Sequence, residues 1–217
     1  MDVVRVARHD ETYDKIICDP GVAQEISDYF TFVVPGAKFM PSYKNKFWDG
    51  KIRIFHMLHA LLYCGLRPKL EEFCRERNYL IEYDFDTTHR EFSLVEGEEF
   101  AKGLGLTLSP RDYQMKAFVA GVREGRVLFL SPTASGKSLI IYLLTKYYDK
   151  KTLVVVPTVS LVHQMVSDFE SYSGEKEDAH KIHSGQERDS ESKIVVTTWQ
   201  SIYKQPKSWF DQFEVVI

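Results

Sequence analysis

A short segment near the middle of the chain has the residue types that bind a phosphate chain. It reads Ser131-Pro132-Thr133-Ala134-Ser135-Gly136-Lys137-Ser138 and lies between apolar runs at 127–130 and 139–144. Where a strand leads through such a loop into a helix, loop amides and the helix dipole favour bound phosphates. We expect Lys137 to neutralise the β and γ phosphates of a nucleotide and the Ser138 hydroxyl to ligate Mg²⁺. The alternative, a serine-rich turn before a helix, leaves Gly-Lys-Ser at this junction unexplained.

The loop resembles the first motif of the superfamily 2 helicases, which commonly has the form Pro-Thr-Gly-x-Gly-Lys-Thr/Ser. Two positions depart from the usual patterns: Ser131 stands where a strict P-loop has its first glycine, and Ala134 replaces the glycine that follows Thr133. The resemblance implies a nucleotide site made by Pro132, Thr133, Ala134, Ser135, Gly136, Lys137 and Ser138.

A second segment upstream of the loop, Arg111-Asp112-Tyr113-Gln114, resembles the Q motif of the same family, in which a glutamine recognises adenine. The chemistry is sensible, because a glutamine side chain can pair with the N6 and N7 edge of adenine. The resemblance therefore implies ATP as the nucleotide, with Arg111 and Gln114 at its base. The alternative is that both residues only begin a helix.

Two further segments resemble the motifs with which this family holds nucleic acid. Residues 154–164 resemble motif Ia, a strand that ends in Pro-Thr before a helix, and residues 194–200 resemble the Thr-x-Gln motif. The resemblance implies contacts to the nucleic-acid backbone by Pro157, Thr158, Thr197, Thr198 and Gln200. The alternative for the second segment is a buried strand with a threonine cap.

The last residues, 213–217, resemble the strand that carries the family's Asp-Glu motif, and neither that motif nor a second motor domain follows in this sequence. Without the acidic motif, Mg²⁺ and the attacking water lack their organiser. We therefore expect this chain to bind ATP and DNA without turning ATP over.

Basic and aromatic residues around Asp49-Gly50 predict a hairpin that binds DNA. Asp-Gly favours tight turns between paired strands, here 42–48 and 51–56. In that register Lys46 faces Arg53, and like charges opposite one another are destabilising unless a phosphate lies between them. The expected DNA-binding face consists of Lys44, Lys46, Trp48, Lys51 and Arg53, with Trp48 free to stack on a base. The alternative is a solvated basic face with Trp48 packed on the core.

The elements that must position these groups fall into two parts. Residues 1–95 are predicted to form a small α+β domain with helices at 19–30 and 66–78 and a strand at 79–85. Residues 96–217 alternate helices at 112–124 and 137–148 with strands at 126–130 and 152–156. Such alternation indicates a parallel sheet covered by helices. The expected fold class is α/β, with an incomplete RecA-like P-loop domain after the small domain.

Composition limits the possible functions. The 217 residues are 44% hydrophobic and 27% charged with a net charge of −3, so the protein is globular and any binding of nucleic acid must be local. The three cysteines have no CxxC spacing, which disfavours a zinc site and a disulfide framework, and no apolar run is long enough to cross a bilayer. We expect an intracellular, cytoplasmic protein. We also expect it to be a monomer.

Across both parts, including 47–53 and 199–207, the sequence resembles a small family of phage recombination and repair helicases. That resemblance implies an ATP-dependent DNA helicase or translocase whose partner is single-stranded or branched DNA. Two alternatives stay open. A P-loop kinase of a small molecule would account for Lys137 and Ser138 but not for Gln114, and a non-catalytic DNA-binding module would not respond to ATP.

Overall fold

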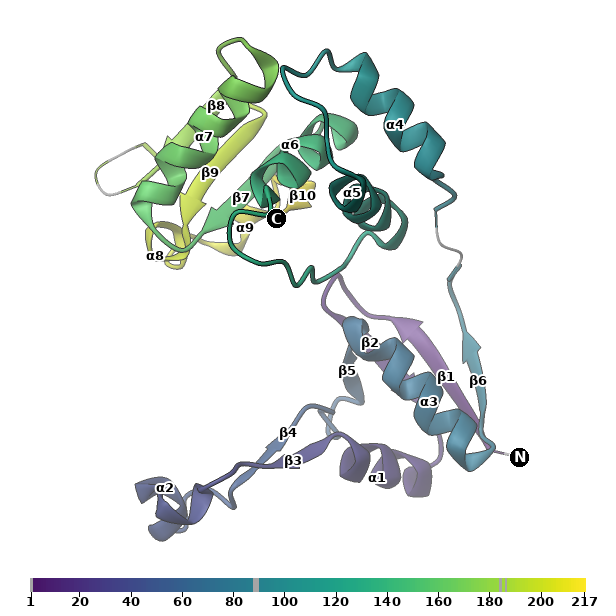
Figure 1. Cartoon of the computed structure of the whole chain (residues 1–217). Coiled ribbons are helices and arrows are strands. Elements are labelled where there is room, and N and C mark those ends of the chain that lie inside the picture. The colour runs from purple at the N-terminus through teal and green to yellow at the C-terminus, as the bar shows by residue number, and fades with distance from the viewer. Residues whose placement is uncertain (1, 88–89, 184, 186) are drawn as a thin grey trace. The chain divides into compact units, whose positions relative to one another are not determined.

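The computed structural model describes residues 2–87, 90–183, 185 and 187–217, which fold into two compact units, 1–88 and 89–217 (Figure 1). The sequence placed the boundary at 95. The structure places it earlier because helix α4 (Leu94–Gly103) packs against helix α5 (Asp112–Glu124) of the second unit. Gly97 makes this packing close, since a Cβ there would meet the Val119 side chain at 2.8 Å.

The first unit is built on a four-stranded sheet in the order β5-β2-β1-β6. Its strands are β1 (Val3–Arg8), β2 (Tyr13–Ile17), β5 (Leu61–Tyr63) and β6 (Leu80–Tyr83). Strand β1 pairs antiparallel with β2 and parallel with β6. Val4 and Val6 are fully buried whereas Arg5 between them is exposed, the period-two pattern of a sheet with one covered face.

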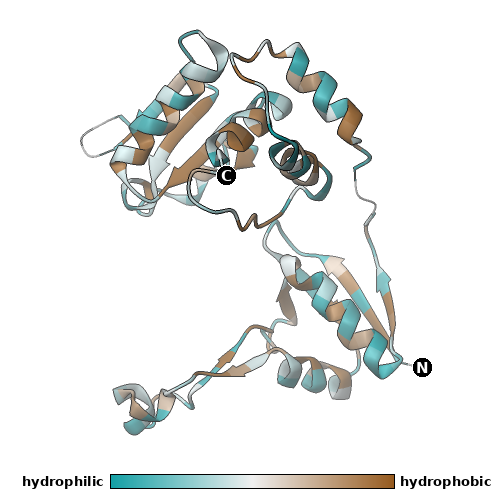
Figure 2. Ribbon diagram, viewed as in Figure 1, coloured by the Kyte–Doolittle hydropathy of each residue, from teal (hydrophilic) through white to brown (hydrophobic). Residues whose placement is uncertain are grey.

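Two helices supply the rest of this core: α1 (Pro20–Tyr29) and α3 (Arg67–Arg77), the latter preceded by the short helix η2 (Cys64–Leu66). Both helices begin with proline near the first position, as the sequence predicted for α1, and they bury Ile26, Leu70 and Phe73 completely. Figure 2 shows apolar and polar residues alternating along α3. Asp14 is also buried, and it accepts two hydrogen bonds from the Arg67 guanidinium at 2.6 and 2.7 Å.

An arm, defined here as residues 31–53, leaves this core after α1 and returns to it before β5. It contains β3 (Thr31–Val33), the short helices η1 (Ala37–Phe39) and α2 (Pro41–Lys44), and β4 (Lys51–Arg53). Strands β3 and β4 pair antiparallel, with Thr31 opposite Arg53, and form a two-stranded ribbon that ends in the short helices (Figure 1).

The predicted hairpin around Asp49-Gly50 is therefore wrong. Residues 42–48 do not form a strand, because Pro41 begins helix α2 and Lys46 has a left-handed backbone with φ of 58°. Gly50 does take the positive φ expected of a turn, 77°, but the strand after it pairs with β3. Lys46 and Arg53 consequently do not face each other.

The second unit has a four-stranded parallel sheet in the order β10-β7-β9-β8. Its strands are β7 (Thr152–Val156), β8 (Ala179–Ile182), β9 (Ile194–Thr198) and β10 (Val215–Val216). The two central strands, β7 and β9, are almost entirely buried and appear brown in Figure 2. Continuous apolar strands of this kind are typical of parallel sheets covered on both faces.

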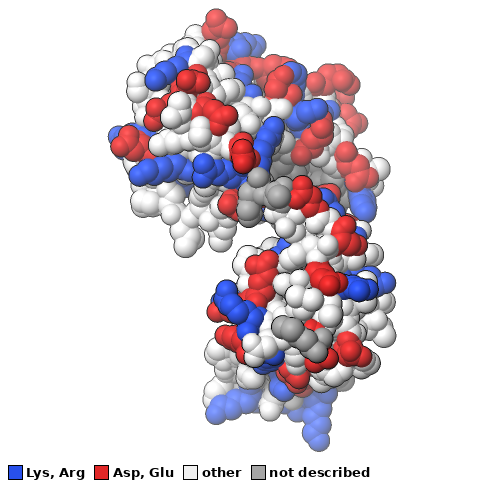
Figure 3. All heavy atoms as spheres, turned by 90° about the vertical axis from the view of Figure 1, so that its right-hand side faces the viewer, with Lys and Arg blue, Asp and Glu red and all other residues white. Residues whose placement is uncertain are grey.

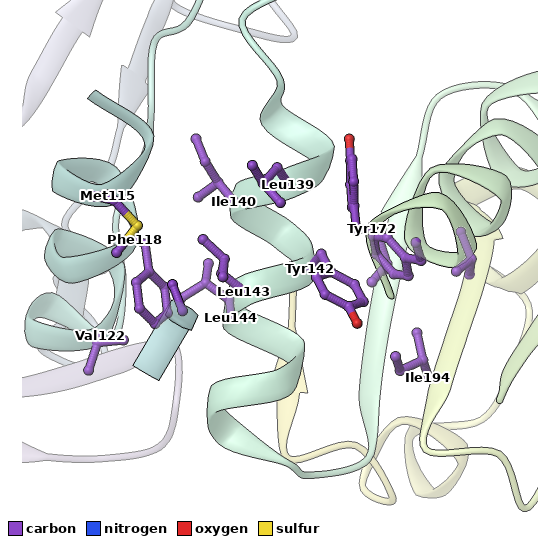
Figure 4. Packing of buried hydrophobic residues seen from close by; sticks show 14 of the residues in the cluster. Met115, Phe118, Val122, Leu139, Ile140, Tyr142, Leu143, Leu144, Tyr172 and Ile194 are labelled. Atoms are coloured by element: carbon purple, nitrogen blue, oxygen red, sulfur yellow. The ribbon is translucent and has the colours of Figure 1, made fainter. Parts of the chain in front are cut away.

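Helices α6 (Lys137–Tyr148) and α7 (Val159–Ser173) pack on each other and on this core, and the one-turn helices α8 (Trp199–Ile202) and α9 (Lys207–Phe210) follow β9. Helix α6 lies between two layers of side chains (Figure 4). Phe118 of α5 contacts it on one side, and Tyr172 of α7 and Ile194 of β9 lie on the other. The loop before α6 is therefore held by the central helix of the unit.

The strand predicted at 126–130 is not formed. Leu128 is 84% exposed and Leu130 92% exposed, and the segment is irregular. A strand requires a neighbour for its backbone hydrogen bonds, and within the described residues the sheet ends at β10 without reaching this segment. The loop at 131–138 thus follows an irregular segment.

Candidate nucleotide and nucleic-acid sites

The loop from Ser131 to Ser138 has the backbone of an anion-binding turn. Ala134 and Gly136 both lie in the left-handed region, with φ of 63° and 75°, and α6 begins at Lys137 directly after Gly136. Alternation of left- and right-handed residues before a helix turns successive amides toward one concave side. Ala134 tolerates this conformation less well than the glycine that the family commonly has here.

Lys137 folds back over the loop that precedes it. Its ammonium donates to the carbonyl oxygens of Pro132 at 2.8 Å and Ser131 at 3.3 Å. Both acceptors are neutral, and hydrogen bonds between an ammonium and charged phosphate oxygens are stronger than those to carbonyls. The lysine is therefore positioned at the loop with acceptors that a phosphate can replace. Thr133 is exposed. Ser135 is buried, and its hydroxyl oxygen lies 2.5 Å from the hydroxyl oxygen of Ser131.

Gln114 connects this loop to the upstream motif. Its amide nitrogen donates to Ser135 O at 2.9 Å, and its amide oxygen accepts from the Arg111 backbone N–H at 2.8 Å. Tyr113 donates to the same Ser135 carbonyl at 2.9 Å. Gln114 is only 6% exposed, so the buried amide is satisfied by backbone and stabilises the loop conformation. The sequence predicted the proximity of these two motifs but not this bonding.

A cavity of about 270 Å³ opens beside this contact. It is lined by Leu108, Ser109, Arg111, Gln114, Ala134, Ser135, Gly136, Leu139 and Tyr172. The loop, the Q-like segment and α7 all contribute to it, so one molecule there can touch both motifs. Glycine suits position 136, because its φ is 75° and a Cβ on it would displace the Gln114 amide nitrogen.

Ser138, the expected magnesium ligand, is bonded to Tyr172. The two hydroxyl oxygens lie 2.7 Å apart, and burial raises the pKa of Tyr172, which keeps the phenol protonated. If Ser138 donates to Tyr172, both lone pairs of Ser138 stay available to a cation. The residues thus fit a nucleotide with its Mg²⁺, although among the described residues no carboxylate lines either cavity that borders the loop.

The second candidate surface lies where β7 and β9 end. Val156 and Thr198 are register partners, so the segments that follow the two strands emerge side by side. A cavity of about 560 Å³ at this edge is lined by Pro157, Thr158, Val159, His183, Gly185, Arg188, Thr198, Gln200 and Ser201. The carboxyl end of a parallel sheet is the usual ligand-binding edge of such folds. We call this cavity the strand-end cavity.

Four of the five expected nucleic-acid contacts line the strand-end cavity, and one does not. Pro157, Thr158, Thr198 and Gln200 are among its lining residues. Thr197 is fully buried, and its hydroxyl donates to the Ile182 carbonyl at 3.0 Å. The expectation that the Thr197 side chain contacts nucleic acid is therefore wrong. Its hydroxyl instead links β9 to β8 through a hydrogen bond.

Two local features shape this cavity. The Thr158 hydroxyl caps helix α7 by accepting from the Leu161 N–H at 3.3 Å, which leaves the other amides of the first turn for a ligand. Arg188, which the sequence reasoning missed, adds a positive charge, and its carbonyl accepts a bond from the Trp209 indole at 3.3 Å. The residues around Arg188 follow no motif, so only the fold reveals its place.

The basic residues of the arm have mixed roles. The Trp48 indole donates to the Lys51 carbonyl at 2.8 Å, and the Arg53 guanidinium pairs with Asp49 at 2.5 Å. This pairing lowers the pKa of Asp49. Trp48 and Arg53 therefore hold the end of the arm in shape, whereas Lys44, Lys46 and Lys51 are exposed.

Comparison with known proteins agrees with both units. The family model "Type III restriction enzyme, res subunit" matches residues 107–217, and "DNA helicase UvsW, N-terminal" matches residues 3–84. The chain is 32% identical over its full length to the ATP-dependent DNA helicase UvsW of phage T4. The chain belongs to the superfamily 2 helicases. It spans 46% of that relative's length.

Further relatives extend the comparison. A DNA 3'-5' translocase, XPB2, of Sulfurisphaera tokodaii is 31% identical over 49% of this chain and 24% of its own length. Two crystal structures of T4 UvsW superpose over the full chain with TM-scores of 0.88 and 0.90, and the chain covers 81% and 46% of them. The fold is thus an N-terminal domain followed by part of a RecA-like domain. No helix among the described residues is long and apolar enough to cross a membrane.

Proposed function

We propose that this chain is the nucleotide- and DNA-binding part of an ATP-dependent helicase or translocase that acts on branched DNA or recombination intermediates. The observation that carries the proposal is the direct contact between Gln114 and the loop ending in Gly136, 2.9 Å from amide nitrogen to Ser135 O. This contact brings the Gln114 side chain and the loop residues Ala134, Ser135 and Gly136 to the lining of one cavity, which supports a nucleotide site there. A nucleotide that fills it would touch both.

Different described residues would bind the phosphates, the Mg²⁺ and the base of ATP. Loop amides, Lys137 and the start of α6 bind the phosphates, Ser138 offers its hydroxyl to Mg²⁺, and Arg111 and Gln114 lie toward the base. Bound ATP supplies a phosphoryl group whose hydrolysis drives motion in this superfamily. The cavities around the loop contain no carboxylate among the described residues, which supports our expectation that these 217 residues bind ATP without turning it over.

DNA would be held by the strand-end cavity and by the arm. Thr158, Gln200 and the free amides of α7 suit the phosphates of one strand, and Arg188 adds charge. The face drawn in Figure 3 mixes acidic and basic side chains, which agrees with local rather than global attraction to DNA. The proposed partner is single-stranded or branched DNA. We expect the chain to act as a monomer in the cytoplasm, which is the host cytoplasm if the protein is viral.

The test measures both ligands on the same protein. Fluorescence anisotropy of a labelled forked DNA and of a fluorescent ATP analogue should each show saturable binding to the 217-residue chain. Gln200→Ala should weaken DNA binding about two- to tenfold, the range of one lost hydrogen bond. The control Gln24→Ala removes an exposed glutamine of α1, and it should change nothing.

The outcomes separate the alternatives. Nucleotide binding without DNA binding would favour a small-molecule kinase. DNA binding without nucleotide binding would favour a non-catalytic DNA module. Either result contradicts the proposal, as does a Gln200→Ala variant that binds DNA as well as the unaltered chain.

A further inference from the structure

The charge of the first unit is concentrated in the arm. Residues 31–53 contain five basic side chains and one acidic side chain. The remainder of residues 1–88 contains seven basic and thirteen acidic side chains. A polyanion is therefore attracted to the arm and repelled by the body that carries it. Among the described residues, none of the four arm lysines is ion-paired with a carboxylate.

The arm also exposes large apolar side chains that the rest of the unit does not cover. Phe47 is 86% exposed and Phe39 70% exposed, and both belong to the end of the arm with its short helices. On the ribbon, Phe32 and Ile52 are register partners and each is 52% exposed. Several large apolar side chains exposed on one short segment make the arm a candidate interaction surface.

Local contacts hold the end of the arm in one conformation, although few of its residues are buried. Asp49 holds Arg53, Trp48 holds the Lys51 carbonyl, and Gly50 packs so closely that a Cβ on it would lie 2.9 Å from Ala37. The residues that fix the shape are thus distinct from the residues that face outward. Rigid presentation of exposed rings lowers the entropic cost of binding.

We propose that the end of the arm binds the unpaired bases at a DNA branch, with Phe47 and Phe39 stacked on bases and Lys44 and Lys46 on the adjoining phosphates. Base faces are accessible only where a duplex has opened, because paired bases stack on one another. Aromatic rings beside lysines match single-stranded nucleic acid, which offers base faces and phosphates together. The inference rests on the proposed function and adds the structural feature of DNA that this chain recognises.

One aromatic–base contact is worth at least about a fivefold change in affinity. The arm therefore gives a preference for forked over fully paired DNA, whereas its lysines strengthen binding to both.

The experiment uses the whole 217-residue chain and a fork with 2-aminopurine at the first unpaired positions. Unaltered protein should bind the fork more tightly than a blunt duplex of equal length and should change the 2-aminopurine fluorescence. Phe47→Ala and Phe39→Ala should each weaken fork binding about fivefold or more, leave duplex binding within twofold, and reduce the fluorescence change. Phe47→Tyr keeps a ring and should retain most of the affinity.

Two matched variants complete the design. Leu58→Ala removes a 90% exposed apolar residue outside the arm and should have no effect. Lys46→Ala should weaken fork and duplex binding alike and lower the slope of affinity against salt by about one. All substituted side chains are exposed, so thermal unfolding should be unchanged and loss of binding cannot be attributed to misfolding.

The results distinguish a failure of the arm's role from a failure of the proposed DNA-binding function. Failure of unaltered chain to bind any DNA overturns the proposed function. Normal DNA binding with unchanged fork preference and fluorescence in Phe47→Ala overturns only the role of the arm. A dimer that Phe47→Ala converts to a monomer would assign the surface to a second copy of the chain and would also overturn it.

Discussion

Gly136 offers a direct test of the contact between the loop and Gln114. The substitution Gly136→Ala forces alanine into a left-handed conformation with φ of 75°, which costs about 1 kcal/mol. The new Cβ also overlaps the Gln114 amide nitrogen, so that side chain must move. Two hydrogen bonds are then lost, to Ser135 O and from Arg111 N–H, at about 0.5–1.5 kcal/mol each. The expected total is about 2–4 kcal/mol.

Urea unfolding followed by tryptophan fluorescence measures this loss, since Trp199 and Trp209 both lie in the second unit. Gly103→Ala is the matched control, because a Cβ on Gly103 meets no atom within 4 Å and its φ is not positive. In a Gln114→Ala background the clash partner is absent, so Gly136→Ala should cost only about 1 kcal/mol. Equal costs in both backgrounds, or no cost in either, would show that residue 136 and Gln114 do not meet as the structure has them.

Three further predictions concern the framework around the sites. Ala134→Gly should raise the free energy of unfolding by about 0.5–1 kcal/mol, because glycine accepts the left-handed conformation that alanine holds under strain; a melting temperature no higher than that of the unaltered chain would contradict this. Burial raises the pKa of Cys74 to about 11, so at pH 8 about one thiol in a thousand is ionised, and a thiol reagent should label it only as fast as the unit unfolds. Glu177→Ala should destabilise the second unit by about 2–3 kcal/mol, since it leaves Lys146 unpaired and the Tyr142 hydroxyl without its acceptor; Glu177→Gln, which keeps an acceptor for Tyr142, should cost less in the same urea titration.

Elements specified by local signals were predicted well from the sequence. Proline at the first turn and regular apolar spacing place α1, and the prediction of a helix at 112–124 matches α5. The buried run at 152–156 matches β7. Capping and periodicity act within a few residues, so a single sequence contains them.

Pairing partners were not predicted, because they depend on residues distant in sequence. Asp49-Gly50 signals a turn, but β4 pairs with β3, and the sequence between them is long enough to form helix α2. The segment at 126–130 has strand-forming residues without a described neighbour to pair with. Local propensity therefore gave the wrong element in both places.

In the candidate sites too, the sequence predicts which segments take part, but not the contacts that depend on folding. Motif spacing predicted site residues in the loop, at Gln114 and at the ends of β7 and β9, and residues of each of these segments line cavities. The motifs do not reveal burial: Thr197 belongs to one of them, yet it is fully buried and its hydroxyl donates to Ile182 O. Arg188 and Tyr172 were missed, because each reaches its site through folding and neither belongs to a motif.

We propose that the loop at 131–138 binds a nucleoside triphosphate through Lys137. The test is isothermal titration of the chain with Mg²⁺ and ATP. Lys137→Ala is compared with the control Lys151→Ala, whose ammonium donates to Ser190 O instead. One charge-assisted contact corresponds to about 10- to 100-fold in affinity. We predict one-to-one binding that Lys137→Ala weakens by that factor and Lys151→Ala leaves unchanged. Absence of saturable binding, or an affinity of Lys137→Ala equal to that of the unaltered chain, would show that Lys137 does not bind the nucleotide.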